Sequence, residues 1–195
     1  MEVCIIKYNA GNVKSVTNAL ERLGVHAEVS DDPDTIKRAD RVIFPGVGEA
    51  STAMAYLRSK SLDQLILSLQ QPFLGICLGL QLMCRHSEEN DTPCLGIFDL
   101  EVVRFDPSMK VPHMGWNIIE DLKGELLANL PARPYMYFVH SYYAQLGEDT
   151  IATANYSSRF SAALQKDNFF AVQAHPEKSG ETGSKILENF LTVEI

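Results

Sequence analysis

Short apolar runs alternate with amphipathic stretches along the first half of the chain. Between the runs, apolar residues recur at helical spacing, and glycine or proline closes most segments. Strands that are apolar on both faces are typical of a parallel sheet covered on two sides by helices. We therefore expect strands over residues 3–6, 26–29, 42–44 and 72–76. Helices are expected over residues 13–23 and 50–57, with a further helix that ends near residue 69 and another that starts at residue 78.

The pattern changes from about residue 94. Short segments with tight turns and little helical periodicity follow one another until a last helix, expected over about 182–191. They indicate antiparallel additions to the sheet, and no linker or repeat interrupts them. The predicted fold is therefore one α/β domain over residues 1–195, with an open, mostly parallel, mixed sheet and helices on both faces. The expected antiparallel segments are 101–105, 116–119, 135–144, 150–155, 161–165 and 169–174.

Composition and charge exclude several classes of partner. The formal net charge is −8, and the longest basic run is Lys37-Arg38, so no basic face is available for a nucleic acid. No apolar run reaches membrane-spanning length, and the residues after Met1 do not resemble a signal peptide. The four cysteines form no metal-binding spacing, which favours free thiols in a reducing cytoplasm. We expect a cytoplasmic protein without a membrane or nucleic-acid partner.

One cysteine lies in an unusual setting. In FLGICLGLQLM, a buried strand runs into a helix through Gly75–Gly79, with Cys77 at the centre. This is the form of a nucleophile elbow, in which glycines let another element approach closely and the helix start favours a negative charge on the sulfur. The N–H of Leu78 is then free to stabilise an oxyanion. The alternative is a buried structural cysteine, which is what we expect of Cys84, placed on the same helix, and of the other two cysteines.

A cysteine nucleophile needs a base, and the base needs an orienting group. Ala174-His175-Pro176-Glu177 offers both directly after an apolar strand, so His175 is the candidate base and Glu177 its orienting carboxylate. No HxH or HExxH spacing supports a metal site, and no cofactor is implied. The remaining histidines are less suited: His26 and His86 lie in surface-like settings, and His113 and His140 could stand behind the site.

A second glycine-rich turn follows another expected strand. In PGVG, Gly46 and Gly48 flank Val47, and such a backbone can present an N–H group or flip. If the turn lies beside Cys77, the N–H of Val47 is a second oxyanion donor. Taken alone, the segment also fits an ordinary glycine turn.

Four segments together resemble one family. FPGVG, GICLGLQLM, FVHSYY and AHPEKS are similar, in order and spacing, to the class I glutamine amidotransferases. YNAGNVKS and KVPHMGWN narrow the resemblance to the branch that serves imidazole glycerol phosphate synthase, and it runs over essentially the whole chain. The departures are small: Ala174 replaces a common aromatic residue, and Asn9-Ala10 replaces a glycine-containing pair.

The resemblance implies a role for each matching residue. Cys77 would attack the carboxamide of glutamine, and His175, oriented by Glu177, would protonate the departing ammonia and then activate water. The N–H groups of Val47 and Leu78 would form the oxyanion hole. The positions that match glutamine-binding residues are Gly46, Gly48, Gln81, Ser141 and Tyr142.

The resemblance also implies a partner. A HisF-type (β/α)8-barrel cyclase would form a heterodimer with this chain and use the ammonia to convert the nucleotide PRFAR to imidazole glycerol phosphate and AICAR. Asn12, Met114, Trp116 and Lys178 match interface positions, although the single tryptophan could instead anchor the core. The Gly46–Val47 peptide would rest with its N–H turned away and flip when the loaded partner binds.

Two competing interpretations stay open. The chain could be the glutaminase of another synthase, such as those that make pyridoxal phosphate, anthranilate or GMP, although KVPHMGWN and AGNVKS count against this. It could also be a subunit that keeps the fold and binds partners without catalysis, which the presence of Cys77, His175 and Glu177 opposes.

Overall fold

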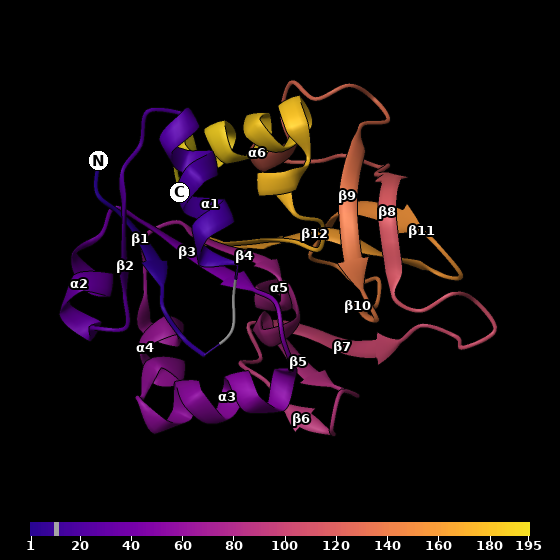
Figure 1. The fold of residues 1–195 in the computed structure, drawn as a ribbon, viewed down its shortest axis with the longest axis horizontal. Helices are drawn as coiled ribbons and strands as arrows, with labels where there is room; N and C mark the ends of the chain where they lie inside the picture. Colours follow the sequence, from indigo (N-terminus) through magenta and orange to yellow (C-terminus); the bar gives the residue numbers. More distant parts are fainter. Residues whose placement is uncertain (10–11) are drawn as a thin grey trace.

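The centre of the computed structural model, which describes residues 1–9 and 12–195, is a seven-stranded sheet (Figure 1). Its order is β11-β12-β13-β4-β3-β1-β2, and the last five strands in this order run parallel. β11 and β12 add antiparallel to one edge, so the predicted mixed sheet is confirmed. The strands are β1 (Val3–Ile6), β2 (Ala27–Ser30), β3 (Arg41–Gly46), β4 (Phe73–Cys77), β11 (Thr150–Asn155), β12 (Arg159–Lys166) and β13 (Phe169–Val172).

Helices cover both faces of this sheet, as predicted (Figure 1). Side chains alternate along β1, so that Cys4 and Ile6 join the core on one face while Val3 and Ile5 join the core on the other. The first core includes the apolar sides of α2 (Pro33–Arg38), α3 (Ala50–Ser59) and α4 (Leu62–Ser68). The second includes those of α1 (Val13–Arg22) and α6 (Gly180–Thr192). Among the described residues, no helix is both long and apolar enough to cross a membrane.

Several segments predicted to extend the main sheet form two smaller sheets instead. One has the order β10-β7-β5-β6, and the other is a two-stranded ribbon of β8 and β9. The expected helix from Leu78 is also shorter than predicted, because α5 (Leu78–Met83) ends before Cys84, whose carbonyl accepts a hydrogen bond from Gly96. The strands are β5 (Cys84–Ser87), β6 (Thr92–Pro93), β7 (Phe98–Arg104), β8 (His113–Ile118), β9 (Tyr135–His140) and β10 (Tyr142–Ala144); the 3-10 turns are η1 (Glu125–Leu127) and η2 (Pro176–Lys178).

The turn from β4 into α5 has no loop at all. Cys77 ends the strand with a φ of 54° and a ψ of −107°, and Leu78 begins the helix. A Cβ atom on Gly79 would overlap the carbonyl oxygen of Phe44 in β3, and one on Gly75 would lie 2.9 Å from the Gly79 carbonyl carbon. The two glycines are therefore required because α5 packs directly on the backbone of the neighbouring strands.

Replacing Gly79 with alanine should destabilise the protein. The new methyl group would meet the backbone of β3, which cannot move without disturbing the central sheet. Overpacking of this kind costs about 1–3 kcal/mol, and we expect Gly79→Ala to reach the upper part of that range. Urea unfolding monitored by circular dichroism measures the loss.

Gly147→Ala is the matched control. A Cβ atom there would overlap Cδ2 of Leu100, which is the end of a side chain that can change rotamer. The loss should stay below about 1 kcal/mol. Equal losses in the two variants would contradict the packing argument.

Candidate active site

The pairing of β13 with β4 brings the predicted nucleophile and base to one edge of the sheet. The two strands are parallel neighbours, with Val172 beside Ile76, so the segments that follow them leave the sheet at the same end. Cys77 is 5% exposed and His175 is 1% exposed. Open α/β sheets bind their ligands at this carboxyl edge.

His175 is held by a carboxylate. Its Nδ1 lies 2.8 Å from Oε1 of Glu177, and both side chains are 1% exposed. The other ring nitrogen, Nε2, is buried without a regular hydrogen bond to the described residues and is therefore available to take a proton. Burial alone would lower the pKa of His175, but interactions with Cys77 and Glu177 raise the pKa to about 10. His175 is therefore a strong proton acceptor for the Cys77 thiol and can hold the transferred proton as an imidazolium.

A cavity of about 300 Å³ opens beside the Cys77 sulfur. This volume suits a small molecule. Gly46 does not line the cavity; it lies beside Cys77 in the pairing of β3 with β4. The structure thus gathers most of the residues predicted to bind the substrate, while their roles stay predictions. Those that line the cavity are Val47, Gly48, Leu78, Gln81, Ser141 and Tyr142.

A tyrosine holds the strand that carries the PGVG turn. The hydroxyl of Tyr8 donates a 2.6 Å hydrogen bond to the carbonyl of Pro45, and a Cβ atom on Gly46 would lie 2.7 Å from the same hydroxyl. Burial, and secondarily the charge of Cys77, raise the pKa of Tyr8 well above its ordinary value, so the phenol stays a donor. No sequence pattern indicated a role for Tyr8 at the site.

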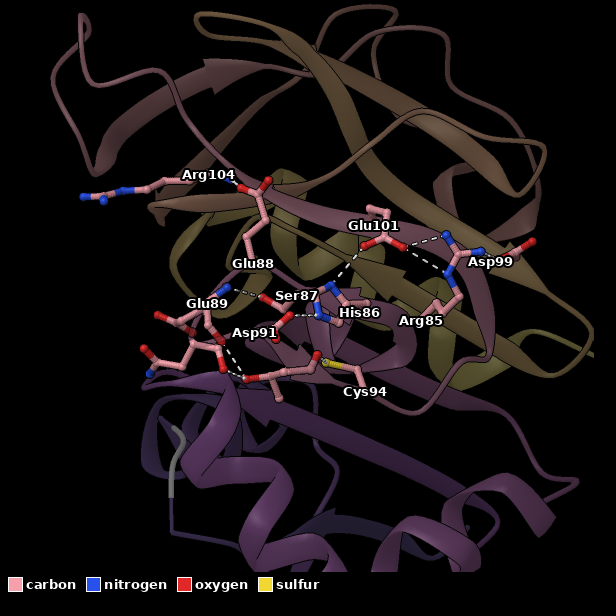
Figure 2. Close-up of polar contacts among 12 residues, drawn as sticks. Arg85, His86, Ser87, Glu88, Glu89, Asp91, Cys94, Asp99, Glu101 and Arg104 are labelled. Carbon is pink, nitrogen blue, oxygen red and sulfur yellow. Dashed lines mark hydrogen bonds and ion pairs between the residues drawn. The ribbon is translucent and has the colours of Figure 1, made fainter.

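Glu89 is the one carboxylate among the described residues that line the cavity. It follows Glu88 just after β5, and Figure 2 shows the Glu88 side chain pointing toward Arg104 while that of Glu89 points away from it. Its Oε2 accepts a 2.7 Å hydrogen bond from the N–H of Ala50, and burial raises the pKa of Glu89 above its ordinary value. No sequence pattern predicted that Glu89 lines a cavity, because the run of Glu88 to Asp91 resembles a solvent-exposed turn.

Two buried histidines lie beside each other at the cavity, and His140 forms part of its lining. His140 Nδ1 donates to the Tyr142 carbonyl at 2.8 Å, so His140 Nε2 must accept the hydrogen bond from His113 Nδ1 at 3.1 Å. Burial lowers the pKa of His113 to about 4 and the pKa of His140 to about 3. Both imidazoles are therefore neutral and serve as fixed hydrogen-bonding groups.

The remaining histidines and cysteines are placed away from this chemistry. His86 lies between Asp91 and Glu101 in the polar network of β5 and β7, at 2.9 Å and 3.0 Å (Figure 2), and does not line the cavity. Burial raises the pKa of Cys94 to about 12 and raises that of Cys84 well above its ordinary value, which keeps both thiols protonated. Within the described parts of the chain, no group of three or more His, Cys, Asp or Glu residues could hold a metal ion.

The β8–β9 ribbon carries an exposed apolar face. Met114 and Trp116 are 60% and 56% exposed, so the tryptophan does not anchor the core. Trp116 lies opposite Tyr137, with ring centroids 6.0 Å apart, and Lys178 lies over the Tyr137 ring at 5.9 Å. We call Met114, Trp116, Tyr137 and Lys178 the ribbon face. An exposed patch of this kind is typical of an interaction surface.

The η2 turn connects the ribbon face to the buried pair of His175 and Glu177. Lys178 directly follows Glu177, and Asn12 donates a 3.4 Å hydrogen bond from Nδ2 to Oε1 of Glu177. Ala10 and Gly11, which belong to the YNAGNVKS segment, lie outside the described residues. The four predicted interface residues therefore lie in three places, at the start of α1, in β8 and in η2, and their contact with a partner stays a prediction.

Comparison with known proteins identifies relatives over nearly the whole chain. Residues 4–193 match the family described as Glutamine amidotransferase class-I. A protein of Bacteroides fragilis named imidazole glycerol phosphate synthase subunit HisH is 57% identical over 98% of this chain and 99% of its own. A protein of Bacteroides thetaiotaomicron with the same name is 54% identical over the same shares of both chains.

Solved structures share the fold at low sequence identity. A putative GMP synthase subunit from Thermoplasma acidophilum superposes with a TM-score of 0.74 at 18% identity, over 98% of this chain and 92% of its own. A structure titled as a glutamine amidotransferase gives a TM-score of 0.75, also at 18% identity, over 96% of both chains. At such identity the likeness concerns the fold alone.

Acid should destabilise the protein through the buried pair of histidines. An unfolded imidazole binds a proton near pH 6.5, whereas His113 and His140 do so only near pH 4 and pH 3 in the folded protein. Below about pH 6.5 the unfolded state therefore binds more protons. The free energy of unfolding should fall by up to about 1.4 kcal/mol per pH unit for each imidazole. Urea titrations at a series of pH values measure this slope.

Two variants test the assignment of that slope. In His140→Gln, the free energy of unfolding should depend less steeply on pH, because one buried imidazole is gone. A His26→Gln change on the exposed surface should leave this slope as it is. If removing His140 did not reduce the slope, another group would be the source of the acid sensitivity.

Proposed function

Because this chain belongs to the class I glutamine amidotransferases, we propose that it is the glutaminase subunit of an imidazole glycerol phosphate synthase. The observation that carries the proposal is the meeting of Cys77, His175 and Glu177 beside a cavity of small-molecule size. The relatives named HisH, which match over nearly the full length of both chains, support the choice of synthase. Residues 1–195 act as one glutaminase domain in the cytoplasm.

The reaction begins when Cys77 attacks the carboxamide carbon of glutamine. The thiol proton passes to Nε2 of His175, and the N–H groups of Leu78 and Val47 stabilise the oxyanion of the tetrahedral intermediate. His175 returns the proton to the leaving nitrogen, so that ammonia departs and a thioester remains on Cys77. Water activated by His175 then releases glutamate and restores the thiol. The raised pKa of His175 suits it to accept the thiol proton in the first step.

Glutamine recognition needs a group that is complementary to its α-ammonium. Glu89 supplies the negative charge in the cavity, and its partly buried position strengthens the attraction. The backbone of Gly48 and the polar groups of Gln81, Ser141 and Tyr142 line the remaining wall. Gly46, which ends β3, supports this wall without lining the cavity.

The partner is a HisF-type (β/α)8-barrel cyclase, which receives the ammonia and converts PRFAR to imidazole glycerol phosphate and AICAR. The ribbon face and Asn12 form the surface that it contacts in a heterodimer. Trp116 and Tyr137 are of the residue types that dominate interface energies, and Lys178 adds a cation at the edge. Binding of the loaded partner turns the Gly46–Val47 peptide so that its N–H faces the oxyanion.

Glutamine hydrolysis should depend on the partner. The isolated chain is expected to release glutamate slowly, and addition of the cyclase with PRFAR should raise the rate about tenfold or more.

Cys77→Ala should abolish the reaction, because no nucleophile remains. Trp116→Ala should weaken binding of the cyclase by about tenfold or more, because a large exposed aromatic contact is lost. Glutamate release and titration calorimetry measure these effects.

The controls separate this function from its competitors. Synthases that make pyridoxal phosphate, anthranilate or GMP should not stimulate the chain, and stimulation by one of them would reassign the partner. A glutamine-analogue electrophile should label Cys77 and spare Cys84. Glutamine-driven cyclisation by Cys77→Ala would show that the subunit binds its partner without catalysing hydrolysis.

Glu89→Gln should raise the KM for glutamine about tenfold or more while changing kcat little. The amide keeps an oxygen for the N–H of Ala50 but loses the charge that attracts the α-ammonium. Steady-state kinetics of the complex measure both constants.

Glu88→Gln provides the neighbouring control. Glu88 is exposed and accepts a hydrogen bond from the N–H of Arg104 instead of lining the cavity (Figure 2). The KM of the Glu88→Gln variant should therefore match that of the unmodified protein. An equal rise in KM for both variants would point to a general effect of surface charge.

A further inference from the structure

Gln173 touches the nucleophile from behind the cavity. It follows β13 by one residue, is 0% exposed, and its Nε2 lies 3.7 Å from the sulfur of Cys77. We propose that Gln173 is a further catalytic residue, whose amide N–H stabilises the Cys77 thiolate and holds the sulfur toward the substrate. The proposal deepens the proposed glutaminase function and rests on it.

A backbone carbonyl fixes the direction of this amide. The carbonyl of Tyr142 can only accept, so the group of Gln81 that lies 2.8 Å from it must be the NH2. The same NH2 lies 3.2 Å from Gln173, and the atom that it meets there must be the oxygen. The NH2 of Gln173 is then the end that faces the sulfur. The amide orientations of both glutamines therefore follow from one carbonyl.

The contact gains strength when the sulfur becomes charged. In the thiol form, Cys77 can donate to the carbonyl of Val139 at 3.8 Å while it accepts from Gln173. Once the proton has moved to His175, the carbonyl only repels the thiolate, whereas the N–H of Gln173 forms a charge-assisted hydrogen bond. Gln173 thus favours the reactive state over the resting state, which is what lowers a barrier.

A purely structural amide would look similar in position but would behave differently when replaced. Buried polar groups need partners in any fold, and Gln173 satisfies one NH2 hydrogen of Gln81. Loss of that role would lower stability without selectively slowing reactions of the sulfur. The rate of Cys77 modification at fixed pH therefore separates the two roles.

The test uses Gln173→Met and Gln173→Glu in the complex with the cyclase. Methionine keeps the length of the side chain but has no N–H, and we expect the rate of Cys77 alkylation by iodoacetamide and kcat to fall about tenfold or more. Glutamate keeps the shape but faces the thiolate with oxygen, and the fall should be larger. KM should stay within about twofold in each, since Gln173 does not line the cavity.

Asn168→Leu is the matched control. Asn168 precedes β13 at the other end, and its buried amide donates to the carbonyls of Leu69 and Gln71, so its loss should lower thermal stability without changing the alkylation rate. Unchanged alkylation and kcat in either folded Gln173 variant would overturn the proposal. So would failure of both variants to fold while Asn168→Leu folds, because the amide would then serve the fold. If the unmodified complex releases no glutamate, the proposed function fails instead.

Discussion

The parallel pairing of β13 with β4 is the constraint on which the site depends. Four consecutive residue pairs, from Phe169 beside Phe73 to Val172 beside Ile76, fix the register of the two strands. A slip of one residue would turn every side chain to the opposite face of the sheet. The register is secured by apolar packing on both faces, since all four residues of β13 are buried. The hydrophobic core therefore sets the distance between the nucleophile and its base.

Three buried histidines end with opposite pKa shifts, although burial lowers the pKa of each. His140 and His113 lose water and gain only neutral partners, so the pKa of each falls and they stay uncharged. His175 loses water as well, but a carboxylate at 2.8 Å and the Cys77 sulfur outweigh that loss and raise its pKa. The sheet edge thus separates an imidazole that can carry a proton from imidazoles that only orient hydrogen bonds. This division depends on the partner of each ring, because all three are buried.

The sequence predicted those parts of the site that local patterns encode. Short motifs and periodicity predicted the sharp turn at Cys77, the pairing of His175 with Glu177 and the mixed sheet. The structure contains that turn, that hydrogen bond and that sheet. The role of Glu89 could not be predicted, because its position depends on where α5 ends and β5 begins, and helical spacing had favoured a helix that continued through Cys84. Gln173 could not be found either, since the end of an apolar strand gives no sign of what its polar residue meets. Such contacts arise only when distant segments pack.

One carbonyl links the reactive sulfur to the surface of the ribbon. The oxygen of Tyr142 accepts from Gln81, which orients Gln173 toward Cys77, and also from His140, which accepts from His113 in β8. Residues alternate along β8, so His113 points inward while Met114 and Trp116 share the neighbouring exposed region. The chain of donors keeps its direction only while both histidines are neutral, and their low pKa values secure this throughout the neutral range. A shift of β8 that moved His113 would therefore reach the hydrogen bonds of the nucleophile through a single shared acceptor.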